Sequence, residues 1–247
     1  MGITAKEVNE LRQKTGAGMM DCKKALEEAN GDFEAAIEFL RKKGQKISAS
    51  RQDRDAKEGG IFAKITGTTG ILIELNCETD FVARNSDFQG LGESIATAAA
   101  ENKPASLEDV RNLSIDGRTI TEILTDNMGK IGEKLDVSKY GKLSGDAVVS
   151  YIHAGARIGV LVAFSGTDGV ANIDGIGRDV AMQIASMNPI AVDKDSVDAT
   201  VVQKEIEIGK EQARQEGKPE AMLEKIAIGK LGKFYKENTL VEQDYVK

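Results

Sequence analysis

Hydrophobic residues recur at helical spacing in three short segments near the start of the chain. Thr4 and Glu7 have the spacing of a capping box, which predicts the start of a first helix. A glycine-rich break precedes a second helix, and Asp32 can cap a third. Gly44 follows two lysines, which is the pattern of a helix terminator. Residues 1–44 are therefore predicted to form a small three-helix domain.

The pattern of strands and helices then repeats itself. Residues 45–58 are polar and lack periodicity, so we predict a linker there. Residues 61–65 and 71–75 flank a glycine-threonine turn, which predicts a β-hairpin, and an amphipathic helix follows. Residues 147–152 and 159–164 have the same layout before another such helix. Two β-β-α units, each too small to bury its own sheet, predict a pseudo-repeated pair of subdomains.

The remaining segments are predicted to be mainly helical. Between the two units, Ser106 and Asp109 mark one helix start, and an apolar stripe runs from Ile120 to Leu135 on another helix. Near the end of the chain, two longer amphipathic helices are joined by a Gly-Lys-Pro sequence, which predicts an antiparallel helical hairpin.

Strands and helices come in runs rather than in strict alternation, so the predicted fold class is α+β. The predicted parts are a three-helix domain at 1–44, a linker at 45–58, a first core subdomain with a helical bridge at 59–140, a second core subdomain at 141–195, an inserted helical hairpin or coiled coil at 196–236, and a return strand at 237–247.

Composition limits the classes of function. The 33 basic and 40 acidic residues give a net charge of −7, which argues against a protein that mainly neutralises nucleic-acid phosphates. Aromatic residues make up only 4% of the chain and Trp is absent, which argues against a platform for stacking bases. No apolar run approaches the ~18 residues of a membrane span. Cys22 and Cys77 form no CxxC pair, and no signal peptide is evident, so we expect free thiols in a cytoplasmic protein.

Motifs for catalysis or cofactor binding are missing from the sequence. There is no Walker loop, no nucleophile elbow and no cluster of metal-ligand residues. His153 is the only histidine, so a histidine-based metal site cannot be built. We therefore expect no catalytic residue, no cofactor and no metal.

The segment 76–85 is the best candidate for a functional site, because it follows directly on a strongly apolar strand. Thr79 or Asp80 can cap a short helical turn, which would hold Phe81 at an exposed start. In the alternative, Phe81 folds back as a hydrophobic staple and Asp80 is only a cap. The residues alone leave both possibilities open.

Three blocks of sequence resemble the bacterial elongation factor Ts family: Thr15–Leu26, Cys77–Ala83 and His153–Val160. Together with the predicted hairpin, the resemblance covers the chain from residue 3 to about 245. It implies a guanine-nucleotide exchange factor that binds the GTPase elongation factor Tu in its GDP-bound and nucleotide-free forms, without covalent chemistry. The first 44 residues would then be a ubiquitin-associated-like domain, and neither a nucleic acid nor a membrane would be a direct partner.

The same resemblance assigns roles to particular residues. The stretch Thr79, Asp80, Phe81 and Val82 matches the family's wedge, which disturbs the site where the Mg²⁺ of bound GDP is held. Other partner contacts are implied at Lys23, Ile131, Gly132 and His153. The chain is expected to lack the family's C-terminal segment. The rival interpretation is an adaptor, in which a ubiquitin-associated-like module is tethered to a coiled-coil scaffold and has no effect on nucleotides.

Overall fold

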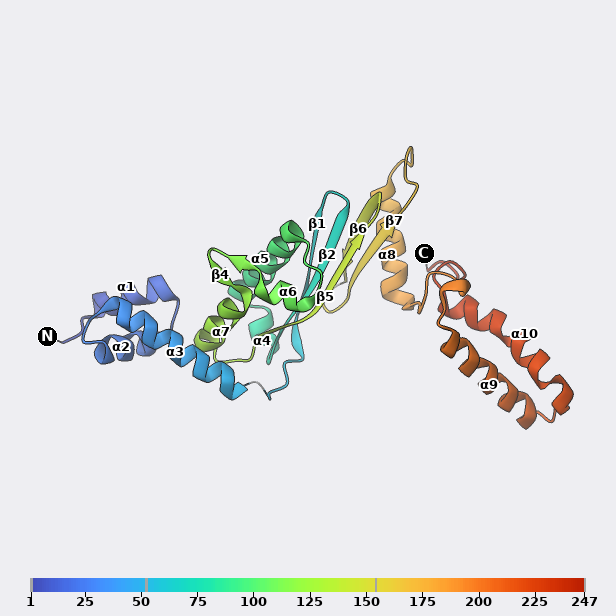
Figure 1. Ribbon diagram of the computed structural model, residues 1–247, viewed down its shortest axis with the longest axis horizontal. Helices are drawn as coiled ribbons and strands as arrows, with labels where there is room; N and C mark the ends of the chain where they lie inside the picture. The colour runs from blue at the N-terminus through green and yellow to red at the C-terminus, as the bar shows by residue number, and fades with distance from the viewer. Residues whose placement is uncertain (1, 52, 154, 247) are drawn as a thin grey trace. The chain divides into compact units, whose positions relative to one another are not determined.

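The computed structural model describes residues 2–51, 53–153 and 155–246 (Figure 1). Its contacts divide the chain into two compact units, Met1–Ala171 and Asn172–Lys247. The secondary structure is mixed, with helices at the N-terminus, small antiparallel sheets and further helices at the C-terminus. The predicted α+β class is therefore confirmed at this level, while the predicted domain boundaries remain predictions.

Three helices begin the first unit: α1 (Ala5–Thr15), α2 (Met19–Glu28) and α3 (Phe33–Arg51). The predicted capping box is confirmed, because Thr4 accepts a hydrogen bond from the Glu7 N–H and the Glu7 carboxylate accepts one from the Thr4 N–H. The helices share a small core of fully buried side chains that includes Leu11, Cys22, Ala25, Leu26 and Ala36.

The prediction that the third helix ends at Gly44 is wrong. Helix α3 continues to Arg51, so residues 45–51 are helical rather than part of a linker. Gly44 lies where α3 crosses α7 (Ile120–Ile131), and a Cβ placed on Gly129 would lie only 2.7 Å from the Gly44 Cα. The glycine allows two helix backbones to approach closely, which is a different use of the same missing side chain.

A three-stranded antiparallel sheet forms the centre of the first unit. Its strands are β1 (Glu58–Thr66), β2 (Thr69–Cys77) and β5 (Asp136–Ser144), in the order β1-β2-β5. The predicted hairpin is confirmed, with Thr66 opposite Thr69. Strand β5 was not predicted.

The helix predicted from the apolar stripe between Ile120 and Leu135 is shorter than expected, because α7 stops at Ile131.

Helices cover one face of this sheet. They are α5 (Ser86–Asn102), α6 (Leu107–Asn112) and α7, with a small hairpin of β3 (Ser114–Ile115) and β4 (Arg118–Thr119) between α6 and α7. The capping box predicted at Ser106 and Asp109 is confirmed. Buried side chains from the central sheet and from α5, α6 and α7 fill one core: Phe62, Ile71, Ile73, Leu75, Phe88, Ile95, Val110, Ile120, Leu124 and Val137.

A second hairpin packs on the opposite face of the central sheet (Figure 1). Its strands, β6 (Ala147–Ile152) and β7 (Gly159–Phe164), have the predicted bounds, and the turn's Ala154 lies outside the described residues. The approach is close, since a Cβ on Gly70 would lie 2.6 Å from Val148 Cγ1. The first unit therefore has three layers: helices, the three-stranded sheet and the two-stranded sheet.

The second compact unit is helical. It contains α8 (Ile173–Met187), a short 3₁₀ helix (Lys194–Ser196), and the antiparallel pair α9 (Ala199–Gln215) and α10 (Glu220–Asn238). The two arms of the predicted hairpin are present. Small residues make their closest approach, because a Cβ on Gly209 would lie 3.0 Å from the Ala227 Cβ.

The return strand predicted at 237–247 is wrong. Helix α10 extends to Asn238, and the strand-like pairing is short: Thr239 forms a bridge with Ala191, and the Leu240 and Val241 N–H groups donate to the Ala191 and Val192 carbonyl oxygens. Further along, α8 holds the segment, because the buried Gln183 side chain accepts a hydrogen bond from the Val246 N–H. Lys247 lies outside the described residues.

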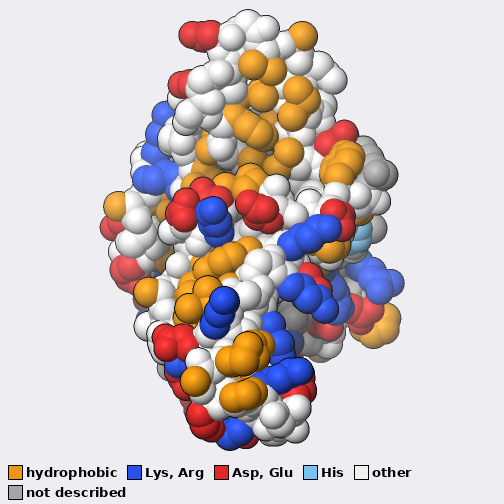
Figure 2. All heavy atoms as spheres, turned by 90° about the vertical axis from the view of Figure 1, so that its right-hand side faces the viewer, with side chains coloured by type: hydrophobic (Ala, Val, Ile, Leu, Met, Phe, Trp, Pro, Cys, Tyr) orange, Lys and Arg blue, Asp and Glu red, His pale blue; other side chains and the backbone are white. Residues whose placement is uncertain are grey.

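The surface in Figure 2 mixes charged side chains of both signs with hydrophobic ones, and its upper part is mainly hydrophobic and uncharged. Within the part of the chain that the structure describes, no helix has both the length and the apolar character needed to cross a membrane.

Candidate functional site

The candidate segment forms a single helical turn, α4 (Asp80–Ala83), directly after the central strand β2. Thr79 is its N-cap, and its hydroxyl accepts a hydrogen bond from the Val82 N–H at 3.4 Å. Val82 and Ala83 pack against the core, whereas Phe81 is 84% exposed. The alternative in which Phe81 folds back as a staple is therefore wrong.

Glu133 holds the backbone that leads into this turn. Its Oε2 accepts hydrogen bonds from the Glu78 and Thr79 N–H groups at 3.1 and 3.0 Å, and its Oε1 accepts one from the Thr79 hydroxyl at 2.6 Å. Glu133 lies just past the end of α7, which closes with Gly132 in the left-handed conformation. The turn is thus attached to a helix more than fifty residues further along the chain.

Glu78 makes the reciprocal contact. Its Oε1 accepts a hydrogen bond from the Lys134 N–H at 2.6 Å and another from the Arg51 guanidinium at 2.8 Å, and its Oε2 accepts one from Arg54 at 3.0 Å. Only 16% of the Glu78 side chain is exposed. Hydrogen bonds to an ionised group in such a setting are stronger than those between neutral groups. Because Arg51 ends α3, this carboxylate also connects the N-terminal helices to the turn.

These contacts change the acidity of Glu78. Partial burial by itself raises the pKa, but the Lys134 N–H and the Arg51 and Arg54 guanidinium groups outweigh it and lower the pKa from its ordinary 4.5 to about 2. The unfolded state therefore binds a proton near pH 4.5, while the folded state stays ionised to about pH 2. The stabilisation is present above pH 4.5 and is lost as the pH falls towards 2.

We expect Glu78→Gln to lower the free energy of unfolding by about 1–2 kcal/mol near neutral pH, because the amide cannot replace the charged acceptor. The difference from the parent protein should shrink as the pH falls below about 4.5, since the unfolded parent then binds a proton that the folded parent does not. Urea unfolding followed by circular dichroism between about pH 7 and about pH 3 measures this. Glu101→Gln, at an exposed position of α5, is the matched control. A difference that stays constant across the pH range would contradict the role given to Glu78.

Cys77 lies buried beneath the turn, and its thiol donates a hydrogen bond to the Thr79 carbonyl oxygen at 3.1 Å. Burial, followed by the negative charge of Glu133, raises the pKa of this thiol to about 11. Cys22 is also buried, and burial likewise raises the pKa of its thiol. Because the thiolate is the reactive form, both cysteines are expected to react slowly in the folded protein.

The other predicted contact residues fall into two groups. Ile131 and Gly132 directly precede Glu133, so the fold brings them to the turn. Lys23 lies on α2 and forms an ion pair with Glu27 at 3.8 Å. His153 is exposed at the turn after β6, with its Nδ1 3.0 Å from the Tyr151 hydroxyl. Lys23 and His153 therefore lie on elements separate from α4.

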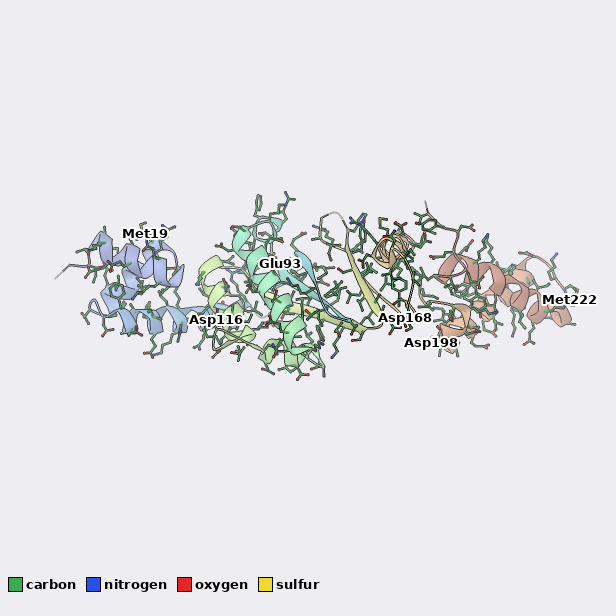
Figure 3. All side chains as sticks on the ribbon, turned by 90° about the horizontal axis from the view of Figure 1, so that it is seen from above. Met19, Glu93, Asp116, Asp168, Asp198 and Met222 are labelled. Carbon is green, nitrogen blue, oxygen red and sulfur yellow. The ribbon has the colours of Figure 1, made fainter. Side chains whose placement is uncertain are left out.

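Sequence reasoning missed several residues near these positions. Met19 (labelled in Figure 3) and Met20, at the start of α2, are 54% and 73% exposed. Met19 lies one helical turn before Lys23. Two methionines just after a glycine break could have signalled an exposed apolar surface. Glu133 and Arg51 gave no local signal, because their partners are distant in sequence.

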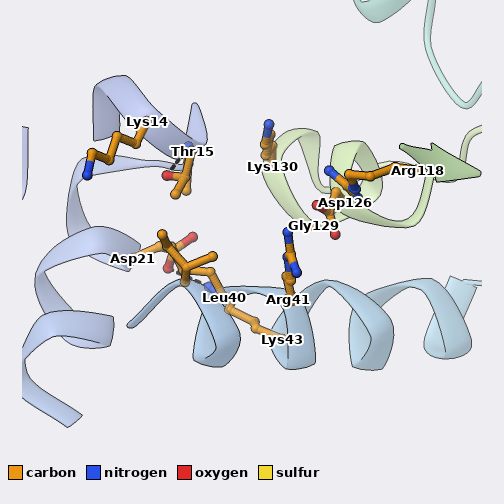
Figure 4. Close-up of a pocket in the computed structure, with 12 residues that line it drawn as sticks. Lys14, Thr15, Asp21, Leu40, Arg41, Lys43, Arg118, Asp126, Gly129 and Lys130 are labelled. Atoms are coloured by element: carbon orange, nitrogen blue, oxygen red, sulfur yellow. Dashed lines mark hydrogen bonds and ion pairs between the residues drawn. The ribbon is translucent and has the colours of Figure 1, made fainter. Parts of the chain in front are cut away.

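A cleft of about 230 Å³ separates the N-terminal helices from α7 (Figure 4). Ion pairs line it, between Lys43 and Asp21 and between Arg118 and Asp126. The lining also includes three further cations: Lys14, Arg41 and Lys130. The contact residues predicted from sequence are elsewhere, so this cleft is not part of the candidate site. Across residues 2–51, 53–153 and 155–246, no three His, Cys, Asp or Glu side chains are grouped so that they could hold a metal ion.

An exposed aromatic side chain on a turn with a fixed backbone is suited to insertion into a pocket of another protein, where such anchors contribute most of the binding energy. The fold and this site thus favour a protein that acts through contact with another protein.

Comparison with known proteins gives the family. A family model described as Elongation factor TS matches residues 78–247. Elongation factor Ts of Cytophaga hutchinsonii is 55% identical over 99% of this chain and 89% of its own length. Elongation factor Ts of Amoebophilus asiaticus is 53% identical over 100% of this chain and 90% of its own length. Elongation factor Ts of Porphyromonas gingivalis is 45% identical over 100% of this chain and 89% of its own length. The chain belongs to the elongation factor Ts family.

The resemblance seen in the three sequence blocks is thereby confirmed. The protein is a nucleotide exchange factor for elongation factor Tu in translation elongation, and it is not a catalytic enzyme. Family membership implies that elongation factor Tu is its partner. The rival interpretation, an adaptor without an effect on nucleotides, is therefore wrong.

Proposed function

We propose that the turn formed by Thr79, Asp80, Phe81 and Val82 is the part of this exchange factor that displaces Mg²⁺ from elongation factor Tu. The observation that carries the proposal is the side chain of Phe81, which is 84% exposed although the backbone beneath it is fixed by Glu133. An apolar ring in this position has no role in the factor's own core. It is placed to enter a pocket of a partner.

The physical mechanism follows from the demands of the ion. GDP is held by phosphate contacts and by Mg²⁺, which requires near-ideal octahedral geometry and tolerates little displacement of its ligands. The Phe81 ring, inserted between helices of the GTPase, shifts the groups that orient the ion. Asp80 forms an ion pair with Arg84 at 3.0 Å and so stabilises the turn, and it need not bind Mg²⁺ itself.

Further contacts with elongation factor Tu are proposed at Lys23, Ile131, Gly132 and His153. Lys23 is supported by the exposed methionines beside it on α2, in a three-helix domain that we interpret as ubiquitin-associated-like. Ile131 and Gly132 are supported by their position next to Glu133. His153 is supported only by its exposure on the turn after β6. Because translation takes place in the cytoplasm, we place the protein there.

The thermodynamics of exchange are fixed by linkage. The factor must bind the nucleotide-free GTPase more tightly than the GDP form, and GDP must then weaken the factor by the same ratio. GTP in excess completes the exchange.

Addition of GDP and Mg²⁺ is therefore expected to dissociate a purified complex of the factor with nucleotide-free elongation factor Tu. Size-exclusion chromatography and calorimetric titration with and without GDP and Mg²⁺ measure this. The loss of affinity for the factor should equal the loss of affinity for GDP that the factor causes. A complex whose affinity does not change with GDP and Mg²⁺ would contradict exchange by mutual displacement.

A further inference from the structure

We infer that Glu133 is a positioning residue for nucleotide exchange: its carboxylate fixes the direction of the Phe81 side chain by holding the two peptides that precede α4. The inference rests on the proposed role of Phe81 and adds a residue that itself need not touch the partner. The sequence resemblance assigned no role to Glu133.

Phe81 cannot orient itself. Because 84% of its side chain is exposed, few contacts of its own ring restrict where the ring points, and its direction follows from the backbone. The Glu78 and Thr79 N–H groups converge on one oxygen of Glu133, at 3.1 and 3.0 Å. Two successive peptide planes are thus fixed just before the helical turn.

The Thr79 hydroxyl extends this control into the turn itself. It donates its hydrogen to Glu133 Oε1 at 2.6 Å, so its lone pairs remain available to accept the hydrogen bond from the Val82 N–H. A hydroxyl has one hydrogen and two lone pairs, and its rotation adjusts to its partners. Glu133 therefore sets the orientation of the N-cap on which α4 depends.

The position of Glu133 just past the end of α7 does not account for its charge. It follows Gly132, which closes the C-terminus of α7, and a negative charge near a helix C-terminus is unfavourable by about 0.3–1 kcal/mol. Three hydrogen bonds to the 78–79 segment offset that cost. The Glu78 carboxylate returns the contact by accepting the Lys134 N–H at 2.6 Å, so the two segments are locked to each other.

Glu133→Ala removes the two oxygens that accept all three hydrogen bonds. It is expected to slow the maximal rate of GDP release at saturating factor by about ten-fold, because small misplacements of an acting group have large effects on rate. The factor concentration that gives half-maximal release should change less than the rate, since the proposed contacts on α2 and α7 remain. Glu133→Gln retains an acceptor for the N–H groups and a donor for Thr79, and should remain within about three-fold of the parent rate.

Glu122→Ala is the matched control. Glu122 accepts hydrogen bonds from the Thr119 N–H and hydroxyl at the start of α7, the end of α7 that is opposite Glu133. The variant therefore loses hydrogen bonds of the same kind, away from the turn. It should exchange GDP at the parent rate. A control that slows exchange as much as Glu133→Ala would show a general effect on stability and would overturn the inference.

Two further measurements separate positioning from general destabilisation. In Glu133→Ala, alkylation of Cys77 by iodoacetamide should be faster than in Glu133→Gln, which removes the same negative charge, while that of Cys22 stays unchanged, because only Cys77 of the two cysteines donates a hydrogen bond to the Thr79 carbonyl oxygen. In a Phe81→Ala background, adding Glu133→Ala should cause little further slowing, because residues that act through one another are not additive. Equal acceleration of alkylation at both cysteines would contradict the inference. So would effects of Phe81→Ala and Glu133→Ala on the rate of GDP release that add in full.

The outcomes also distinguish this inference from the proposed function. If Phe81→Ala alone leaves GDP release unchanged, the proposed role of the turn is wrong. If Phe81→Ala slows release but Glu133→Ala does not, the turn acts as proposed and only the positioning role of Glu133 is wrong.

Discussion

Phe81→Ala is expected to slow GDP release from elongation factor Tu by roughly 10–100-fold at saturating factor, while the complex still forms. The variant keeps the backbone of α4, the buried Ala83 and the partly buried Val82, but loses the ring that would enter the partner. Because the ring is 84% exposed in the free protein, its removal should change the free energy of unfolding by no more than about 0.5 kcal/mol. Stopped-flow release of a fluorescent GDP over a range of factor concentrations measures the maximal rate.

The matched control is Met222→Ala, which removes another exposed apolar side chain, at the start of α10 (Figure 3). It should exchange GDP at the parent rate. Phe81→Leu, which keeps part of the apolar volume, should fall between the parent and Phe81→Ala. Parent-like release by Phe81→Ala would remove the turn from the mechanism.

Gly129→Ala should lower the free energy of unfolding by about 2 kcal/mol, because the added Cβ would lie 2.7 Å from the Gly44 Cα and would force α3 and α7 apart. The loss should appear even though alanine is favoured over glycine in a helix by about 1 kcal/mol. Separation of the helices would also pull Arg51 away from Glu78, so exchange should slow as well.

Gly90→Ala in α5 is the control for intrinsic helix preference, because nothing lies within 4 Å of its added Cβ. It should raise the free energy of unfolding by up to about 1 kcal/mol. Urea unfolding of both variants beside the parent measures the contrast. Equal stabilisation by the two substitutions would show that α3 and α7 do not pack through these glycines.

Local sequence signals predicted local structure well. The capping boxes at Thr4 and Ser106, the hairpin turn before Thr69 and the N-cap at Thr79 all depend on residues only a few positions apart, and each is present. Gly44 was misread because a terminating glycine and a glycine at a helix crossing have the same local sequence. The two cases differ only in the packing partner, here Gly129 of α7.

Features that depend on distant residues could not be predicted. Strand β5 is mostly polar, and its place in the sheet depends on pairing with β2 rather than on its own pattern. The exposure of Phe81 was equally undecided, because a staple and a projecting ring share one local sequence. Glu133, which holds the turn, lies fifty-four residues from Thr79. The candidate site could thus be located from sequence, but what holds it could not.

The most direct test of the proposed mechanism is GDP release at saturating factor, measured for the parent protein and Phe81→Ala with Mg²⁺ present and again after Mg²⁺ is chelated. If the ring acts by disturbing the ion site, the defect of Phe81→Ala should be large with Mg²⁺ and should shrink to about two-fold or less without it, because the ion is then already gone. A defect of the same size in both conditions would contradict the displacement of Mg²⁺ by Phe81.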